Sequence, residues 1–313
     1  MEFPHRHQVL QVIDSLANEH LQGKVRAIRM SLISLLAGGH LLLEDIPGLG
    51  KTSLALALSG ILGLDFGRVQ CTSDLLPSDI TGLSIFDRQK NQFHFIKGPI
   101  FNNLVLVDEV NRAMPKTQSA MLEAMEERRV TVEGVTYELP DPFLVIATQN
   151  PAEQVGTFPL PESQLDRFLM TTGIGYPPPD LEKKIIQLGS VREQLQTIKP
   201  MLSAEQILEA RHFIRQHILL GDKVTDYIHQ LMLRSRDHES IYSGISTRGG
   251  LNLAAAARAE AYLVGRDYVV PEDVQQVAVA VAAHRLILRP EAAIQNKEEV
   301  FRSLLAETPV PIS

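Results

Sequence analysis

A glycine-containing turn between an apolar run and a helical pattern limits what the first part of this sequence can form. Residues 41–60 read LLLEDIPGLGKTSLALALSG. Such a turn points successive backbone N–H groups and a helix N-terminus at one place, which suits the phosphates of a nucleotide. The alternative is a plain strand–turn–helix connection, because the pattern GxxxxGK[ST] requires glycine at position 45, where this sequence has Asp45.

Despite that mismatch, the turn carries the groups that phosphate binding needs. Gly48 and Gly50 let the backbone approach the phosphates, Lys51 adds a positive charge, and the Thr52 hydroxyl can ligate Mg²⁺. Aspartate tolerates unusual backbone angles better than most residues, so we expect Asp45 to adopt them in place of the missing glycine. The predicted phosphate-binding residues are Pro47, Gly48, Leu49, Gly50, Lys51, Thr52 and Ser53, and Lys51 is also a catalytic candidate.

Two adjacent acids follow a second apolar run. In LVLVDEVNR, Asp108 and Glu109 come at the carboxyl end of four apolar residues, the edge where open α/β sheets bind ligands. Asp108 is placed to hold the magnesium shell, and Glu109 to orient and activate an attacking water. Two acids at this point could instead mark the exposed end of a strand. Their combination with the GKT turn favours a Mg²⁺-nucleotide site with Thr52 and Asp108 as metal ligands.

Three further polar residues are candidates for the same chemistry. Asn150 ends the apolar run of ATQN, where an amide can position a water, although asparagine is also common in turns. Arg167, in PESQLDRF, lies either in a surface ion pair or, in an oligomer, reaches a neighbour's γ-phosphate as an arginine finger. Arg248 starts a helical pattern that Ser246 or Thr247 can cap. Arginine is unfavourable at a helix start, which favours a functional role for it.

The order of apolar runs and helical patterns predicts an α/β fold with a parallel sheet. Apolar runs without alternation are typical of strands buried on both faces; they are HLLLED, RVQCT, NLVLVDEV, PFLVIATQN and FLMTTGIGY. Two β-hairpins are predicted as well, at residues 84–97 and 128–139, the second with Glu133 and Gly134 at its turn. Projecting hairpins are usually structural decoration, but a ring-shaped machine could use them to touch a substrate.

The sequence YPPPD, residues 176–180, ends the strand pattern, because three prolines cannot continue a central strand or a helix interior. Beyond it the patterns are helical, with Pro271 at a predicted first helical position. The length of 313 residues favours two domains. We therefore predict a nucleotide-binding core at residues 1–180 and a small all-helical domain at residues 181–313.

Charge and cysteine content narrow the partners and the environment. The net charge is −7 and neither end is a basic tail, which gives no electrostatic footprint for nucleic acid or an anionic membrane, although a local basic patch is compatible with an acidic whole. The single cysteine, Cys71, suits a reducing cytoplasm, and its apolar surroundings predict a buried thiol. The N-terminus lacks a secretory signal pattern, and the apolar run at residues 30–43 is shorter than the ~18 residues of a membrane span. We expect a cytoplasmic protein without a membrane span.

Five stretches together resemble the MoxR family of AAA+ ATPases. They are GGHLLLEDIPGLGKT, DLLPSDITG, GPIFNNLVLVDEVNRAMPKTQSAMLEAMEERRVTVEG, ATQNPAEQVGTFPLPESQLDRF and GRDYVVPEDV. The resemblance covers nearly the whole chain. It implies an AAA+ P-loop core with a parallel five-stranded sheet, β-hairpin inserts at the two predicted hairpins, and a C-terminal all-helical lid domain.

The resemblance also implies roles for the candidate residues. It makes the GKT turn a Walker A loop and Asp108 with Glu109 a Walker B motif. It makes Asn150 sensor 1, Arg167 the arginine finger and Arg248 sensor 2, although STRGG around Arg248 departs from the SPRA-like form of the family. Arg112 is a second candidate for contact across a subunit interface.

Members of the family are chaperone-type ATPases, typically hexameric rings. They often act with a partner that carries a von Willebrand factor A domain to mature or activate a protein complex, sometimes by assisting metal or cofactor insertion. The resemblance therefore implies an ATP- and Mg²⁺-dependent homo-oligomer, a hexamer, with such a partner and a client complex.

Two other functions stay open. One is a nucleic-acid-translocating motor, against which the acidic turn VEGV and the mixed tip DRQKNQ argue, because a tracking hairpin needs basic residues. The other is a nucleotide-gated scaffold with little hydrolysis.

Overall fold

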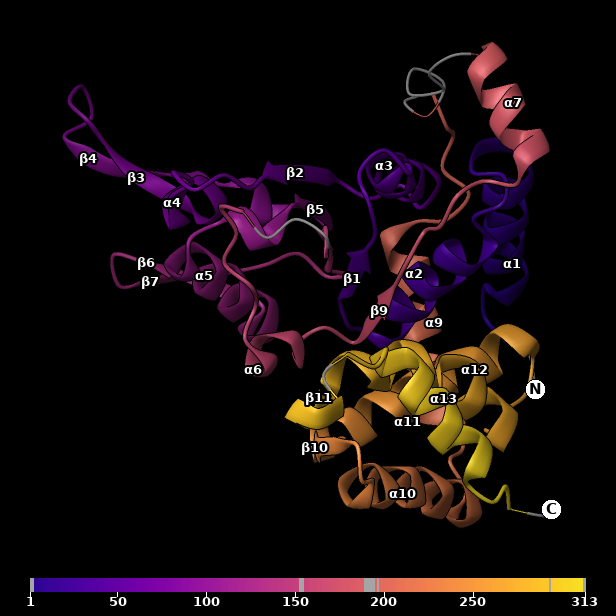
Figure 1. Ribbon diagram of the computed structural model, residues 1–313. Coiled ribbons are helices and arrows are strands. Elements are labelled where there is room, and N and C mark those ends of the chain that lie inside the picture. The colour runs from indigo at the N-terminus through magenta and orange to yellow at the C-terminus, as the bar shows by residue number, and fades with distance from the viewer. Residues whose placement is uncertain (1–2, 152–154, 189–194, 196, 293, 312–313) are drawn as a thin grey trace.

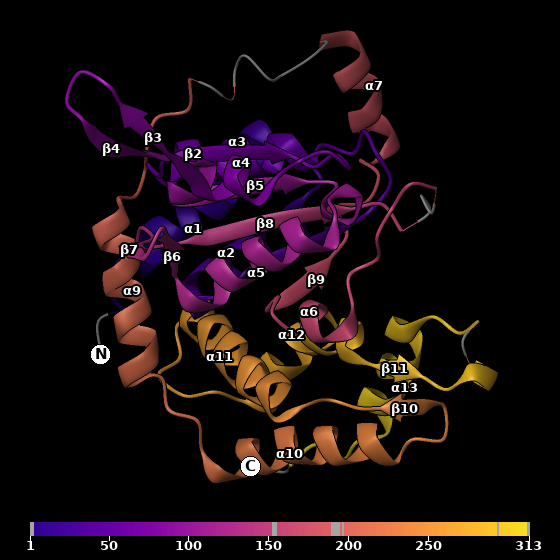
Figure 2. The ribbon, with the colours of Figure 1, turned by 90° about the vertical axis from the view of Figure 1, so that its left-hand side faces the viewer.

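A five-stranded parallel sheet, with helices on both faces, forms the centre of the fold (Figures 1 and 2). The computed structural model describes residues 3–151, 155–188, 195, 197–292 and 294–311, so residues 152–154 of the stretch ATQNPAEQVGTFPLPESQLDRF lie outside it. The strand order is β2–β5–β8–β1–β9, and each neighbouring pair is parallel. Each predicted apolar run overlaps one strand, although β2 begins two residues before RVQCT, and the α/β prediction is confirmed. The strands are β1 (Leu41–Glu44), β2 (Phe66–Gln70), β5 (Leu104–Asp108), β8 (Leu144–Gln149) and β9 (Met170–Thr172).

Successive residues of the central strands enter two different cores, because neighbours along a strand point to opposite faces. Leu41 and Leu43 pack on the face covered by α2 and α3, whereas Leu42 and Val107 pack on the face covered by α4 and α5. Both faces are therefore apolar, which explains the runs without alternation. These helices and the N-terminal one are α1 (Arg6–Ser15), α2 (Val25–Ala37), α3 (Lys51–Ile61), α4 (Pro77–Thr81) and α5 (Pro115–Glu127).

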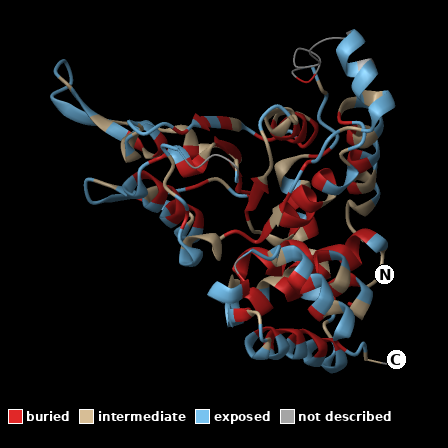
Figure 3. Cartoon of the chain, in the orientation of Figure 1, coloured by how far each residue is buried: buried red, intermediate tan, exposed pale blue. Residues whose placement is uncertain are grey.

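The two predicted hairpins are present and project from the same side of the sheet (Figure 1). The first joins β3 (Gly82–Asp87) to β4 (Gln92–Lys97), and the second joins β6 (Arg129–Val132) to β7 (Val135–Glu138). Glu133 and Gly134 have φ of 50° and 80°, as a tight hairpin turn requires. Phe95 of the first hairpin stacks on Tyr137 of the second at 4.2 Å between ring centroids, so the hairpins support each other. Their outer parts are exposed (Figure 3).

The C-terminal region is mainly helical, as predicted, with one short two-stranded ribbon added to it. The helix α7 begins at Pro179, the third proline of YPPPD, so the predicted domain boundary after residue 180 falls inside its first turn. Ser246 caps α11 by accepting a hydrogen bond from the Gly249 N–H at 3.0 Å. The elements of this region are α7 (Pro179–Leu188), α9 (Ala204–His217), α10 (Asp222–Asp237), β10 (Ile241–Ser243), α11 (Thr247–Val264), α12 (Pro271–Ala282), β11 (Ile287–Leu288) and α13 (Lys297–Glu307), and the short helix α6 (Glu162–Leu165) precedes β9.

The C-terminal helices share one hydrophobic core with α1, α2 and α3. A buried arginine adds a polar connection between the two regions. Arg285, which follows α12, donates to the main-chain oxygens of Phe168 at 2.6 Å and Leu169 at 3.2 Å and to the Asp166 carboxylate at 2.7 Å. The segment between α6 and β9 is thereby held by the lid. The division into residues 1–180 and 181–313 stays a prediction.

Two smaller expectations concern the single cysteine and a membrane-spanning helix. Cys71 is buried, as predicted, and burial together with the charges of Asp108 and Glu109 raises the pKa of its thiol to about 12. In the described part of the chain, no helix combines the length and apolar character needed to cross a membrane.

Candidate functional site

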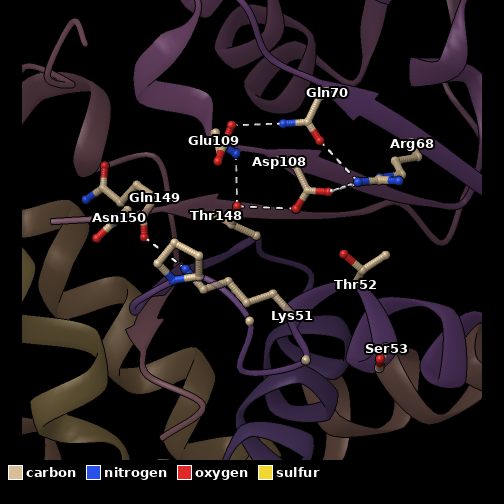
Figure 4. A pocket seen from close by; sticks show the side chains of 13 residues that line it. Lys51, Thr52, Ser53, Arg68, Gln70, Asp108, Glu109, Thr148, Gln149 and Asn150 are labelled. Carbon is tan, nitrogen blue, oxygen red and sulfur yellow. Dashed lines mark hydrogen bonds and ion pairs between the residues drawn. The ribbon is translucent and has the colours of Figure 1, made fainter. Parts of the chain in front are cut away.

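One pocket at the carboxyl edge of the sheet gathers most of the predicted site residues (Figure 4). Its volume is about 370 Å³. The ends of β1, β5 and β8 are neighbours in the sheet, so residues distant in the sequence meet there. The lining residues are Pro47, Gly48, Gly50, Lys51, Thr52, Ser53, Arg68, Gln70, Asp108, Glu109, Thr148, Gln149 and Asn150. Leu49 is the exception among the predicted loop residues, since its side chain packs against the hydrophobic core.

The predicted phosphate-binding loop contains two glycines with left-handed backbone conformations. Gly48 has φ of 86° and Gly50 has φ of 94°, and Gly50 is the residue that caps α3. A Cβ at Gly48 would meet no atom within 4 Å, so glycine is needed here for its backbone freedom and not for space. The Lys51 ammonium donates to the main-chain oxygens of Asp45 and Gln149. Burial lowers the pKa of Lys51, and nearby carboxylates oppose that shift.

Asp45 does not adopt the glycine-like backbone conformation that we expected. It lacks the positive φ that a substitute for glycine would show. Its carboxylate instead accepts from the N–H groups of Ile174 at 2.9 Å and Gly175 at 2.7 Å, and from the Ile46 N–H at 2.9 Å. The expected backbone role was wrong, because Asp45 ties the phosphate loop to the segment after β9, a contact that glycine cannot make.

Asp108 and Glu109 both face the pocket because the chain turns sharply between them. Glu109 has φ of 56°, which ends β5 and turns its side chain toward the site. Thr148 of β8 supports both acids: its hydroxyl accepts from the Glu109 N–H at 2.9 Å and lies 3.4 Å from Asp108 Oδ1. Sequence reasoning missed Thr148, although a polar residue in the buried run of β8 was a usable signal.

The neighbouring strand β2 supplies two more side chains that the sequence analysis missed (Figure 4). Arg68 forms an ion pair with Asp108 at 2.8 Å and donates to Gln70 Oε1 at 3.1 Å. Gln70 in turn donates to Glu109 Oε2 at 3.0 Å, and Arg112 lies 3.3 Å from the same oxygen. The available sequence signal for Arg68 and Gln70 was the alternation of polar and apolar residues in RVQ, which places both polar residues on one face of β2. In the parallel register of β2 and β5, Gln70 lies beside Asp108.

The donor set of this pocket fits Mg²⁺, which prefers oxygen ligands. Thr52 contributes a hydroxyl from α3, and Asp108 contributes a carboxylate from β5 that already pairs with a guanidinium cation. Within the described ranges, the structure contains no group of three or more His, Cys, Asp or Glu side chains that could hold a metal ion. Bound Mg²⁺ would therefore need the phosphate oxygens of a nucleotide to complete its shell.

The two remaining predicted residues lie in a second pocket of about 270 Å³, between the core and the lid. Glu126, at the end of α5, pairs with Arg167 at 3.1 Å and with Arg248 at 2.5 Å. Neither arginine lines the pocket of Lys51. The fold thus brings Arg167 and Arg248 together, but it does not bring either of them to the phosphate loop of its own chain.

Known families match both parts of the chain. Residues 40–170 match the ATPase family associated with various cellular activities (AAA), and residues 233–304 match the AAA lid domain. The Chaperone MoxR1 of Mycobacterium tuberculosis is 39% identical, over 92% of this chain and 79% of that protein. The chain belongs to the MoxR family of AAA+ ATPases.

Other relatives agree with this MoxR assignment. Protein MoxR of Paracoccus denitrificans is 30% identical over 95% of each chain, and YeaC of Bacillus subtilis, an uncharacterised protein, is 44% identical over 94% of this chain and 92% of its own. A crystal structure from Cytophaga hutchinsonii is 38% identical and superposes with a TM-score of 0.90, covering 98% of this chain and 96% of that one. In this MoxR-family chain the first pocket falls in the AAA match and Arg248 in the lid match.

Proposed function

We propose that this MoxR-family protein binds and hydrolyses Mg²⁺-ATP at interfaces between copies of itself and uses the energy to remodel or activate partner protein complexes. One observation carries the proposal. The predicted phosphate-binding residues and the two acids line one pocket, whereas Arg167 and Arg248 line a second pocket outside it. A site divided in this way suits hydrolysis that needs a neighbouring subunit.

Within one subunit, each side chain has a defined task. Lys51 and the loop N–H groups bind the phosphates, and Thr52 and Asp108 hold Mg²⁺, which when bound supplies positive charge against the phosphate oxygens. Glu109 accepts a proton from the attacking water, and Asn150 orients that water. The support is that all five residues line one pocket.

Arg167 and Arg248 act on the ATP of the neighbouring subunit in this proposal. Both are part-exposed, at 30% and 47% of their side-chain surface, and both pair with Glu126. A guanidinium can exchange a carboxylate for a phosphate, because its planar donors match either group. In this proposal Arg248, as sensor 2, contacts the ATP bound to the neighbouring subunit and not the ATP bound to its own subunit. Arg112, paired with Glu109, is a further candidate at this interface.

The assembly and its clients complete the proposal. We infer a homo-oligomeric ring, a hexamer, that works in the cytoplasm with a von Willebrand factor A domain partner and a client complex, in some cases for metal or cofactor insertion. The relative MoxR1 of Mycobacterium tuberculosis is named a chaperone. The first hairpin is suited to touch a client because Phe86 and Phe93 at its outer end are 46% and 65% exposed.

Mixing two inactive variants tests the divided site. Lys51→Ala and Arg167→Ala should each lower the ATPase rate by about 10³-fold or more. An equimolar mixture should regain activity, because some interfaces combine an intact phosphate loop with an intact arginine. The matched control is a mixture of Lys51→Ala and Glu109→Gln, which damage the same pocket and should regain far less. Full turnover by a dilute monomeric sample would overturn the divided site.

Three measurements test this function and separate it from the alternatives. Glu109→Gln should still bind ATP but hydrolyse it very slowly; unchanged turnover in this variant would remove the role of Glu109. If the rate of wild type is itself negligible, a nucleotide-gated scaffold is the better description. A rate stimulated by DNA or RNA, and lost steeply with salt, would favour a nucleic-acid motor.

A further inference from the structure

The ion pair between Arg68 and Asp108 places a cation on the carboxylate that is proposed to hold Mg²⁺. Arg68 Nε and Nη2 lie 2.9 Å and 2.8 Å from the same oxygen, Asp108 Oδ2. The other oxygen of Asp108 faces the Thr148 hydroxyl at 3.4 Å. Arg68 therefore occupies one of the two carboxylate oxygens through which Asp108 would hold Mg²⁺, and both side chains line the pocket.

The surroundings let the guanidinium move without leaving the site. The Arg68 side chain is 39% exposed and comes from an edge strand, whereas Asp108 is 10% exposed. Arg68 Nη2 also donates to Gln70 Oε1 at 3.1 Å (Figure 4). The guanidinium of Arg68 can therefore release Asp108 while it keeps its hydrogen bond to Gln70, so the pocket already holds a second acceptor for it.

We propose that Arg68 is a built-in counter-cation of Asp108, which Mg²⁺ replaces when it binds together with ATP. The inference rests on the proposed function, since it concerns the same nucleotide pocket. Before Mg²⁺ binds, Arg68 neutralises a carboxylate that would otherwise repel the phosphates. After Mg²⁺ binds, the metal performs this neutralisation and Arg68 competes with it for Asp108.

Removing the guanidinium should therefore have unequal effects with and without the metal. In Arg68→Gln, Asp108 keeps its negative charge and loses its cation, so ATP should bind more weakly in excess EDTA. In excess Mg²⁺ the same variant should bind ATP as tightly as wild type or more tightly. The ratio of the dissociation constant in EDTA to that in Mg²⁺ should rise by about 2- to 5-fold, as expected for the loss of a part-exposed ion pair.

Fluorescence anisotropy of a fluorescent ATP analogue measures both dissociation constants without relying on turnover. Arg68→Lys keeps a cation near Asp108 and should hold the ratio near that of wild type. Arg302→Gln, which removes an exposed arginine paired with Glu298 on α13, is the matched control and should leave both constants unchanged. Should Arg68→Gln fail to fold by circular dichroism, Arg68→Met provides an uncharged side chain of similar length.

Each other outcome overturns the proposal. Equal weakening in EDTA and in Mg²⁺ would mean that Arg68 binds the phosphates themselves. No change in either condition would mean that the ion pair only stabilises the strand. Wild type that binds ATP in Mg²⁺ but not in EDTA would show that Arg68 cannot act as the counter-cation. Wild type that binds no nucleotide under either condition would refute the proposed function itself, which is a distinguishable failure.

Discussion

His40, the residue before β1, should make the fold sensitive to mild acid. Its ring is buried, accepts a hydrogen bond from the Val145 N–H at Nδ1 over 3.0 Å, and donates from Nε2 to the Met125 main-chain oxygen over 3.2 Å. Protonation would put a proton on Nδ1, against the Val145 N–H. Burial lowers the pKa of His40 to about 4, and the nearby positive charges of Arg128 and Arg211 act in the same direction.

The size of the effect follows from the difference between the folded and unfolded pKa values. In the unfolded chain the pKa of a histidine is about 6.5, so the unfolded state takes up the proton first as the pH falls. The contribution of neutral His40 to the free energy of unfolding is complete above about pH 6.5 and is lost as the pH falls toward 4. The difference between an unfolded pKa of about 6.5 and a folded pKa of about 4 amounts to roughly 3 kcal/mol in total, of which about 2 kcal/mol is lost by pH 5.

Urea unfolding of wild type and His40→Asn at pH 7.5 and pH 5, followed by far-ultraviolet circular dichroism, measures this loss. The variant should be less stable at pH 7.5, because it cannot keep both hydrogen bonds. Its further loss on acidification should be smaller than that of wild type by about 2 kcal/mol. His284, whose pKa burial also lowers, is present in both proteins and cancels in the difference. Equal acid losses, or a His40 imidazole that titrates near pH 6.5 by NMR, would refute the reasoning.

Two further predictions concern the junction between core and lid. Arg285→Leu removes the buried guanidinium that pairs with the Asp166 carboxylate and donates to the main-chain oxygens of Phe168 and Leu169, so it should lower the free energy of unfolding by roughly 3–5 kcal/mol. Thermal melts should show this loss, with the exposed Arg302→Leu as a control near wild type. Glu126→Gln removes the carboxylate that holds the two arginines of the second pocket. Because these pairs are part-exposed, it should lower the protein concentration at half-maximal ATPase rate only about 2- to 5-fold; an unchanged or higher concentration would contradict the proposed exchange.

Local patterns in the sequence determined the fold class and most of the first pocket. Apolar runs without alternation predicted strands buried on both faces, and the glycines before Lys51 predicted the turn that begins α3. Parallel strands end at one edge of a sheet, so the polar residues that follow them, Asp108 and Asn150, had to meet. The chemistry of this edge was therefore accessible without knowledge of the complete fold.

Tertiary structure alone decided which partners these residues have. The register of β2 against β5 placed Arg68 and Gln70 beside the two acids, and the path of the chain after β9 gave Asp45 its acceptor role. The docking of the lid paired Arg248 with Glu126 and Arg167, away from the phosphate loop of its own chain. Such contacts depend on register and on the packing of segments far apart in the sequence, whereas a local pattern reports only the conformation of its own segment.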